Sequence, residues 1–190
     1  LGKIMKDKNI PFLDAPVSGG VKRAVSGTIS IMVGGESAAI ARAKPIFEAV
    51  SSDIFECGPL GAGHATKAMN NMLSALGVLA TTEALLIGRR FGLDPSTLTN
   101  VINKSSGRNN ATELKMHQFI LKENWKSGFS SGLMLKDLTI AQNLARNVGL
   151  SAPCTALVRD AFAETVDHYG PSSDHTMLAK LLQETRKTKL

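Results

Sequence analysis

The longest segment of helical character in the sequence predicts a single helix from about Ala62 to Phe91. Gly92 follows this segment and is suited to end a helix, and Asp94 followed by Pro95 is typical of the start of the next one. The apolar run from Met72 to Ile87 is interrupted by polar residues and is shorter than the ~20 residues that a membrane span needs. We therefore expect a buried core helix and no membrane partner.

Four further interruptions divide the remainder of the C-terminal two-thirds into helices. They are Gly107–Ala111, Lys126–Gly132, Gly149 and the turn Tyr169–Asp174, whose aspartate could cap the last helix. The sequence from residue 61 to residue 190 is therefore predicted to be an all-α domain of five or six helices.

The first sixty residues alternate strand and helix patterns instead. Ile10–Ala15, Thr28–Val33 and Asp53–Cys57 are short runs of strand type. Between the last two, Ser37–Val50 places its apolar residues three and four positions apart, which forms one helical stripe. A strand, a helix and a strand in this length predict an α/β unit at the edge of a sheet. We therefore divide the chain into residues 1–60 and 61–190.

The composition limits the class of protein. The chain has 190 residues, of which 43% are hydrophobic and 20% charged, and can bury a good core. Its 22 basic and 16 acidic residues give a net charge of +6, but the charges are scattered apart from Arg186–Lys189, so no nucleic-acid partner is expected. The distant Cys57 and Cys154 favour buried free thiols in a reducing compartment, the cytoplasm or, in a eukaryote, the mitochondrial matrix.

The first of three groups of residues that could carry chemistry is the loop Asp14–Gly20. Ser18 precedes the adjacent glycines Gly19 and Gly20 in this loop. Glycines let backbone N–H groups approach a ligand closely, and a serine hydroxyl adds another donor, so the loop could bind a carboxylate. An ordinary turn between a strand and a helix would explain the same residues.

The second group is the glycine-rich turn Gly58–Gly63 and the start of the long helix. Lys67 and Asn71 are four residues apart and project from one helical face, with Asn70 on its flank. The helix dipole and partial burial would both disfavour a charged lysine here, which predicts a lowered pKa for Lys67. A surface lysine beside solvated amides is the alternative. The turn is not a dinucleotide fingerprint, because the third glycine and the acidic residue that should follow are absent.

The third group is the pair Lys136 and Asp137, which interrupts the apolar start of a helix shortly after Phe129. Spacing alone leaves the pair either as a solvated stripe or as part of a site. The four histidines have no metal-ligand spacing, so no metal site is predicted.

In this order and spacing, the three groups resemble the motifs of the β-hydroxyacid dehydrogenase family, which includes 3-hydroxyisobutyrate dehydrogenase, tartronate semialdehyde reductase and L-threonate dehydrogenase. The resemblance covers essentially the whole chain and rests on Asp14–Gly20, Gly61–Asn71 and Lys136–Asp137. It implies an α/β remnant, the last strands of a Rossmann-type sheet, followed by an all-α domain like the C-terminal domain of 6-phosphogluconate dehydrogenase. It also implies NAD or NADP as cofactor, a small hydroxy acid as substrate, and a homodimer or homotetramer.

The resemblance implies a role for each residue of the predicted site. Lys67 would be the general acid/base that exchanges a proton with the substrate hydroxyl while hydride passes between substrate and nicotinamide, and Asn71 would hold the reacting oxygen. The substrate carboxylate would be bound by Ser18, Gly19 and Gly20, and Asn70 would assist beside Asn71 in binding the substrate. Lys136 would approach the nicotinamide end of the cofactor, and Phe129 and Asp137 would complete the pocket wall.

The sequence departs from the family at its start. The family begins with a nucleotide-binding domain that carries a glycine fingerprint, and nothing before Asp14 can supply one. We therefore expect a fragment, and we expect these 190 residues alone to bind the cofactor poorly and to be inactive. A non-catalytic helical oligomerisation or interaction module is the alternative. Lys67 and Asn71 favour the dehydrogenase, since the related imine reductases usually lack the lysine.

Overall fold

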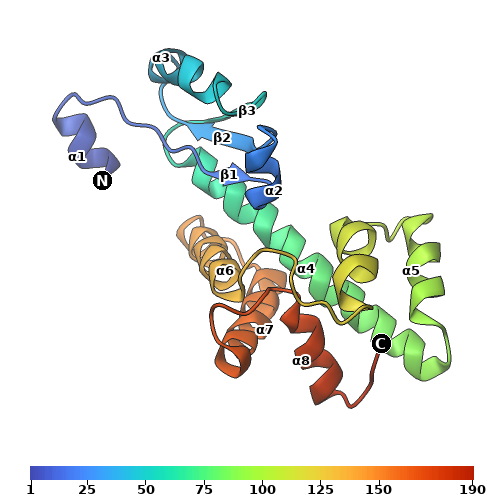
Figure 1. Cartoon of the computed structure of the whole chain (residues 1–190). Helices are drawn as coiled ribbons and strands as arrows, with labels where there is room; N and C mark the ends of the chain where they lie inside the picture. The colour runs from blue at the N-terminus through green and yellow to red at the C-terminus, as the bar shows by residue number, and fades with distance from the viewer. The chain divides into compact units, whose positions relative to one another are not determined.

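The computed structural model describes all 190 residues, and its contacts divide the chain into two units. The first unit is Leu1–Asn70 and the second is Asn71–Leu190, so the division falls inside one helix, α4 (Ala62–Phe91). All the strands belong to the first unit. The second unit contains the remainder of α4, the helices that follow it and their connections (Figure 1).

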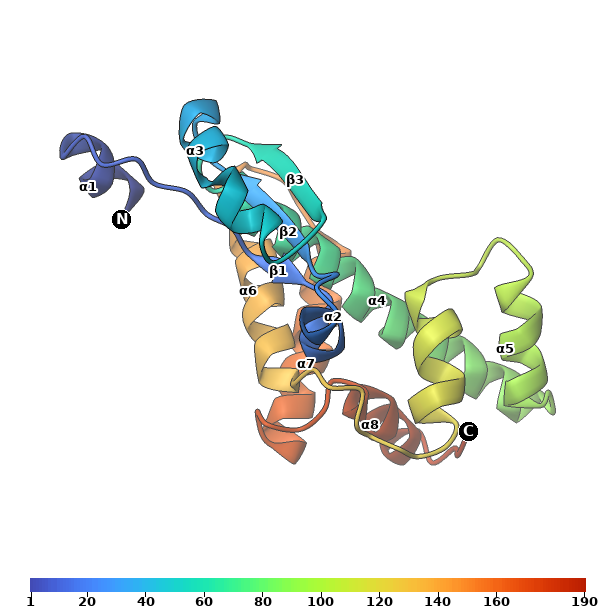
Figure 2. The same ribbon diagram turned by 45° about the horizontal axis from the view of Figure 1, so that its top comes forward.

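The first unit is built around a small sheet with the strand order β1-β2-β3 (Figure 2). β1 (Val17–Ser18) pairs antiparallel with β2 (Ser30–Gly34), and β2 pairs parallel with β3 (Asp53–Gly58). A parallel pair needs a crossover connection, which α3 (Ser37–Glu48) provides. Ile31, Val33 and Ile40 form the buried centre of this unit. The short helices α1 (Gly2–Asp7) and α2 (Gly20–Val25) complete it.

The predicted strand Ile10–Ala15 is wrong, whereas the other elements expected in the first sixty residues are confirmed to within two residues. Of the six residues only Asp14 pairs with the sheet, in an isolated bridge to Gly34. Pro11 lies within the segment and Pro16 directly follows it, and because proline has no backbone N–H it cannot donate to a ladder. The regular strand β1 therefore starts only after Pro16.

The second unit packs around α4, whose bounds are those that the sequence predicts. Asp94 begins α5 (Pro95–Asn103) as expected, because its carboxylate accepts the Thr97 N–H at 2.7 Å. The chain continues through η1 (Ala111–Ile120), α6 (Ser131–Asn147), α7 (Pro153–Tyr169) and α8 (Met177–Thr185). The largest fully buried side chains of the core that these helices share are Leu85, Met116, Ile120, Leu138, Phe162 and Leu178.

Two helices have unusual features. α4 is long and apolar enough to cross a membrane, but half of its most apolar 18-residue window is buried inside the protein, as in the core helix of a globular domain. η1 is a π-helix of ten residues, whereas π-helical segments are rare and mostly confined to single turns.

Two smaller expectations are wrong. Asp174 does not cap α8, because its carboxylate instead accepts hydrogen bonds from Ser127, Gly128 and Thr176 and so fastens two loops together. Both cysteines are free as expected, but Cys154 is exposed rather than buried.

Candidate functional site

The carboxylate of Asp14 holds the first turn of α4. One of its oxygens accepts the Gly61 N–H at 2.6 Å, and the other accepts the His64 N–H at 2.7 Å and lies 2.8 Å from His64 Nδ1. Burial of Asp14 opposes its charged form, but the hydrogen bonds from Gly61 and His64 outweigh this, so the pKa of Asp14 lies below its usual value. Asp14 therefore serves the helix as an N-terminal anion.

Gly63, the last glycine of this turn, and Gly34 in β2 are required by close packing. A Cβ atom on Gly63 would come within 2.3 Å of the Met32 carbonyl oxygen and 2.8 Å of the Asp14 carboxylate. A Cβ atom on Gly34 would meet the other Asp14 oxygen at 2.4 Å. The start of α4 therefore lies directly against β2, and its free N–H groups already have an anion from the protein itself.

The loop Ser18–Gly20 has the glycine-dependent backbone that was expected. Gly19 has φ +126° and Gly20 has φ +64°, values in the left-handed region where residues with a side chain are strained. α2 begins directly after them, so the loop is also the strand-to-helix turn of the alternative interpretation. The backbone is compatible with both interpretations, and carboxylate binding by Ser18, Gly19 and Gly20 stays a prediction.

Within the second unit the structure brings together three residues from two of the predicted groups. The buried Asn71 donates from Nδ2 to Asp137 Oδ2 at 2.5 Å, and Lys136 Nζ lies 2.7 Å from Asp137 Oδ1. Asp137 lies on the buried face of α6 together with Met134, Leu138 and Ala141. Lys136 remains largely exposed and reaches back to the carboxylate. The Lys136–Asp137 pair is therefore a buried acceptor with a cation beside it, rather than a solvated stripe.

Of the remaining predicted residues of α4, Lys67 lies one turn before Asn71 and Asn70 directly precedes it. Lys67 is half-buried and Asn70 is exposed. Because α4 is continuous, Lys67 stands four residues before Asn71 on the same helical face, as the sequence predicts.

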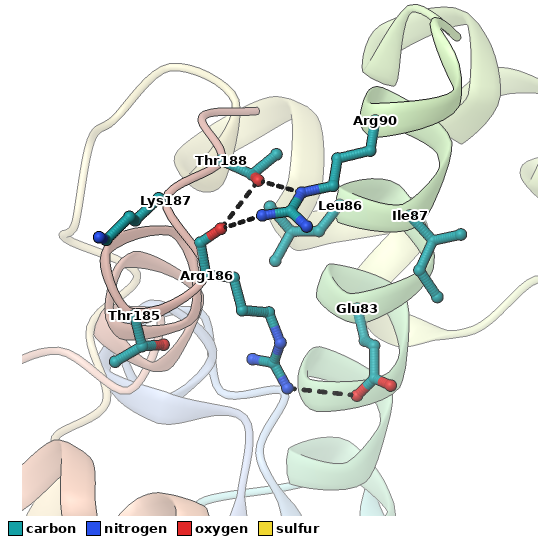
Figure 3. Close-up of a pocket in the computed structure, with 8 residues that line it drawn as sticks. All are labelled: Glu83, Leu86, Ile87, Arg90, Thr185, Arg186, Lys187 and Thr188. Atoms are coloured by element: carbon teal, nitrogen blue, oxygen red, sulfur yellow. Dashed lines mark hydrogen bonds and ion pairs between the residues drawn. The ribbon is translucent and has the colours of Figure 1, made fainter.

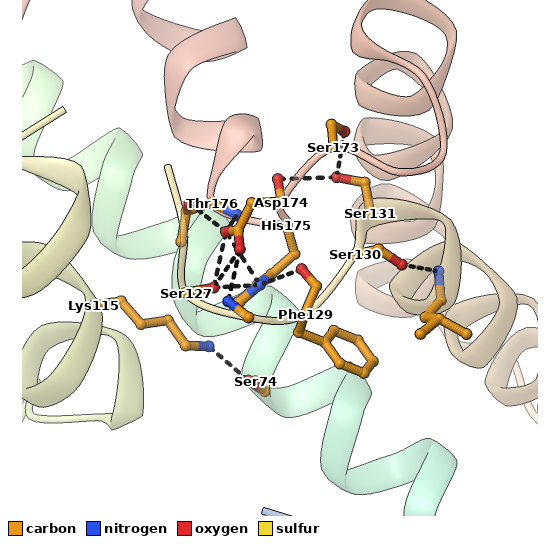
Figure 4. Close-up of polar contacts among 12 residues, drawn as sticks. Ser74, Lys115, Ser127, Phe129, Ser130, Ser131, Ser173, Asp174, His175 and Thr176 are labelled. Carbon is orange, nitrogen blue, oxygen red and sulfur yellow. Dashed lines mark hydrogen bonds and ion pairs between the residues drawn. The ribbon is translucent and has the colours of Figure 1, made fainter. Parts of the chain in front are cut away.

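Phe129 lies in the loop before α6 and packs against the core of the second unit (Figure 4). Its ring meets the ring of His175 edge to face, with centroids 5.9 Å apart, and its carbonyl oxygen accepts the His175 N–H at 2.8 Å. Burial, with a smaller contribution from the charge of Lys115, lowers the pKa of His175 to about 4, so this histidine is neutral at neutral pH. The structural role expected for the histidines fits His175.

A buried lysine that the sequence analysis did not single out lies beside this cluster. Lys115, in the π-helix η1, is 8% exposed, and its Nζ donates to Ser74 Oγ of α4 at 2.9 Å (Figure 4). Burial lowers the pKa of Lys115 to about 8, although the negative charge of Asp174 acts in the opposite direction. Ser74 is three residues beyond Asn71, so both lie on the same side of α4.

Two hollows of the surface lie away from these residues. One, of about 450 Å³, is lined by the end of α4 and residues 185–188 (Figure 3). Its polar groups bond to one another: Arg90 donates to Thr188 and to the Arg186 carbonyl oxygen, and Arg186 lies 3.7 Å from Glu83. Another, in the first unit, is lined mainly by α1 and the loops next to the sheet. None of the predicted site residues lines either hollow.

Two sequence models of protein families match the chain. The one described as the NAD-binding segment of NADP-dependent 3-hydroxyisobutyrate dehydrogenase matches residues 61–182, and the one described as the NAD-binding domain of 6-phosphogluconate dehydrogenase matches residues 1–58. Both are models of nicotinamide-cofactor oxidoreductases, and NAD or NADP is the cofactor of this class. Because the first match covers more than half of the chain, the chain belongs to the β-hydroxyacid dehydrogenase family, as the motifs predict.

Several known proteins are similar to the chain. It is 38% identical to 2-(hydroxymethyl)glutarate dehydrogenase of Eubacterium barkeri, over 85% of this chain and 54% of that protein. It is 34% identical to the NAD-dependent L-serine dehydrogenase of Pseudomonas aeruginosa, over 95% of this chain and 63% of that protein. The solved structure of Mycobacterium tuberculosis 3-hydroxyisobutyrate dehydrogenase with L-serine matches with a TM-score of 0.86 and 31% identity, over 95% of this chain and 64% of that one. The chain thus spans between half and two-thirds of the length of these relatives.

Proposed function

We propose that the protein is an NAD- or NADP-dependent dehydrogenase of a short 3-hydroxy acid, with Lys67 as the general acid/base. Family membership supports the reaction class. The observation that carries the assignment of residues is the buried hydrogen bond from Asn71 to Asp137, one helical turn from Lys67. A buried amide fixed by a carboxylate is suited to hold a reacting oxygen in one orientation.

The proposed reaction begins with neutral Lys67. Its amine accepts the proton of the substrate hydroxyl as the C–H hydride leaves and the C=O bond forms, and the reverse reaction returns the proton to the alkoxide oxygen. The nicotinamide ring supplies the hydride acceptor when the cofactor is bound. Asn71 orients the substrate oxygen that loses or gains the proton. Asp137 fixes the amide of Asn71, and Lys136 balances the charge of Asp137.

The remaining roles follow the family resemblance. Ser18, Gly19 and Gly20 would bind the substrate carboxylate, Asn70 would assist Asn71 in binding the substrate, and Phe129 would form part of the pocket wall. We propose that residues 1–60 end the dinucleotide-binding domain and that residues 61–190 form the substrate domain, in line with the two matched segments.

The cofactor fits this chain at one end only. Lys136 is exposed enough to approach the nicotinamide end, whereas the start of α4 is occupied by Asp14 and cannot take the phosphates. We accordingly expect residues 1–190 expressed by themselves to show no turnover and weak cofactor binding.

The substrates in the names of the relatives support the proposed substrate class. Their names give 2-(hydroxymethyl)glutarate, L-serine and 3-hydroxyisobutyrate as substrates. These three acids share a hydroxymethyl group on the carbon next to a carboxylate, and we propose this unit for the substrate here. Related proteins include bacterial enzymes and mitochondrial ones, in line with the proposed cytoplasmic or matrix location.

We also propose that the protein is a homodimer or homotetramer in which a second copy covers α4. Leu73, Ile87 and Phe91 are 64%, 65% and 83% exposed. Ala80 and Ala84 are exposed as well, so the five side chains recur at helical spacing along one face of α4. An apolar stripe of this kind on a protein of this size marks an interaction surface, and it matches itself in a two-fold pair of helices.

The central test is the substitution Lys67→Ala in the whole protein. We expect kcat for the oxidation of short 3-hydroxy acids to fall by about 10²- to 10⁴-fold, the usual contribution of a general acid/base. Lys122→Ala, at an exposed lysine of the second unit, is the control and should leave kcat unchanged. Activity that survives Lys67→Ala would contradict the assignment. A whole protein that turns over no 3-hydroxy acid and forms a stable oligomer would favour the non-catalytic helical module.

A further inference from the structure

Lys115 is a buried cation without an ion pair. Its side chain is 8% exposed, it donates to the neutral Ser74 hydroxyl, and no carboxylate lies within ion-pair distance of its ammonium group. The acidic group whose charge acts on Lys115 is Asp174, and its oxygens already accept hydrogen bonds from Ser127, Gly128 and Thr176. A buried charge is costly unless it is paired, so an anion from outside the chain would complete this arrangement.

The position of Lys115 connects it with the proposed substrate site. Its partner Ser74 is three residues beyond Asn71, which is about 4.5 Å along the helix axis. Four C–C bonds of an extended carbon chain cover about the same distance. An acid whose reacting carbon lies at Asn71 could therefore place a second acidic group, at the end of a two-methylene arm, beside Lys115.

The backbone that carries Lys115 is itself unusual. In η1 the buried residues are Ala111, Thr112, Lys115, Met116 and Ile120. In an α-helix, at about 100° per residue, Ala111 and Ile120 would point in opposite directions, and the wider turn of the π-helix puts them on one side together with Lys115. π-helical segments are frequent at functional sites.

We propose that Lys115, supported by Ser74, binds a second carboxylate of the substrate and selects for 3-hydroxy acids that carry an acidic side arm. The proposal rests on the proposed dehydrogenase function and narrows its substrate class. Lys115 recognises the end of the arm and does not touch the carbon that is oxidised. Asp174 and His175 face the same interior region, and His175 is neutral there, so the lysine is the only cation in this group.

The test compares two unreactive probes in the whole protein. Glutarate has a carboxylate at each end, and its monoamide has the same length but one neutral end. We expect calorimetry to give a dissociation constant for glutarate about 10- to 100-fold below that of the monoamide, the usual effect of a charge-assisted hydrogen bond. Lys115→Met should bring the ratio of the two constants to about one. Lys122→Met, at an exposed lysine, should leave the ratio at the wild-type value.

A second readout uses the unsubstituted protein, in case Lys115→Met does not fold. Glutarate should raise the pKa of the Lys115 ammonium, followed by NMR, by more than the monoamide does, because an anion beside it favours the charged form. Equal binding of the two probes, a preference that survives Lys115→Met, or an unchanged lysine pKa would overturn the proposal. Turnover of short 3-hydroxy acids is assayed in the same samples. Turnover without a preference for glutarate would contradict the second-carboxylate site alone. A preference for glutarate without turnover would contradict the proposed dehydrogenase function.

Discussion

Replacing Asp14 should destabilise the first unit by a predictable amount. In Asp14→Ala the backbone N–H groups of Gly61 and His64 both lose the buried carboxylate that accepts them. A hydrogen bond to a charged group contributes about 1.5–3 kcal/mol, and water can partly replace the carboxylate because Gly61 and His64 are exposed, so the two bonds together should account for roughly 2–4 kcal/mol of the free energy of unfolding. Asp14→Asn should cost roughly half as much. The two backbone N–H groups bond to different carboxylate oxygens, and an amide has only one.

The pH dependence gives this prediction a second, independent check. The pKa of Asp14 is lowered in the folded protein, so its contribution is complete above the unfolded value of about 3.9 and is lost as the pH falls through the folded value. The difference in stability between wild type and Asp14→Asn should therefore be constant near neutral pH and shrink in acid.

Urea unfolding followed by amide hydrogen exchange in β2 and the first turn of α4 is the appropriate assay. Fluorescence would follow the second unit instead, because the single tryptophan, Trp125, packs against the core of that unit. Asp7→Asn, at an exposed carboxylate of α1, is the control and should change stability by no more than about 0.5 kcal/mol. A loss below about 0.5 kcal/mol for Asp14→Ala, or a difference that does not depend on pH, would refute the reasoning.

Three further predictions concern the second unit. Asp137→Ala removes the acceptor that fixes Asn71, and we expect kcat/KM to fall by at least about tenfold while the helical circular dichroism stays unchanged; an unchanged kcat/KM would show that Asp137 does not position the amide. Placing charges on the exposed stripe with Ile87→Glu and Phe91→Lys should shift the protein toward monomers in analytical ultracentrifugation, and an unchanged sedimentation profile would remove that surface from the interface. The pKa of His175 is lowered to about 4 in the folded protein, so below about pH 6.5 the unfolded chain binds a proton that the folded protein does not. The free energy of unfolding should therefore fall as the pH is lowered from 6.5 to about 4, and His175→Gln should reduce this pH dependence.

The sequence predicts the helical elements well where local chemistry determines them. Asp94 and Pro95 define the start of α5, and the pattern from Ala62 to Phe91 gives α4 with its observed bounds. It also identifies the family, since three motifs in one order are more specific than any of them alone. The segment Ile10–Ala15 is apolar enough for a strand, and the prolines at 11 and 16 are visible in the sequence, but only the structure shows that Asp14 alone pairs with β2.

The residues that sequence analysis missed depend on partners far along the chain. Asp14 heads a recognised motif, yet its bonds go to residues 47 and 50 positions later. Lys115 is a charged residue next to the apolar Leu114 and Met116, which was the available signal, but a 3.6-residue period cannot show that a π-helix turns it inward. The partner of Asn71 could be suspected from the Lys136–Asp137 motif, but only the packing of α6 shows that Asp137 is the buried member of the pair.

The division between the two units passes through α4 after Asn70, between Lys67 and Asn71. A continuous helix is not a flexible link at such a point, because each backbone N–H bonds to the carbonyl oxygen four residues earlier. The spacing of the lysine and the amide is therefore a property of the helix alone, and no rearrangement of the units can alter it while the helix stays intact. Inserting a single residue between them would turn the lysine by about 100° relative to the amide without removing either group.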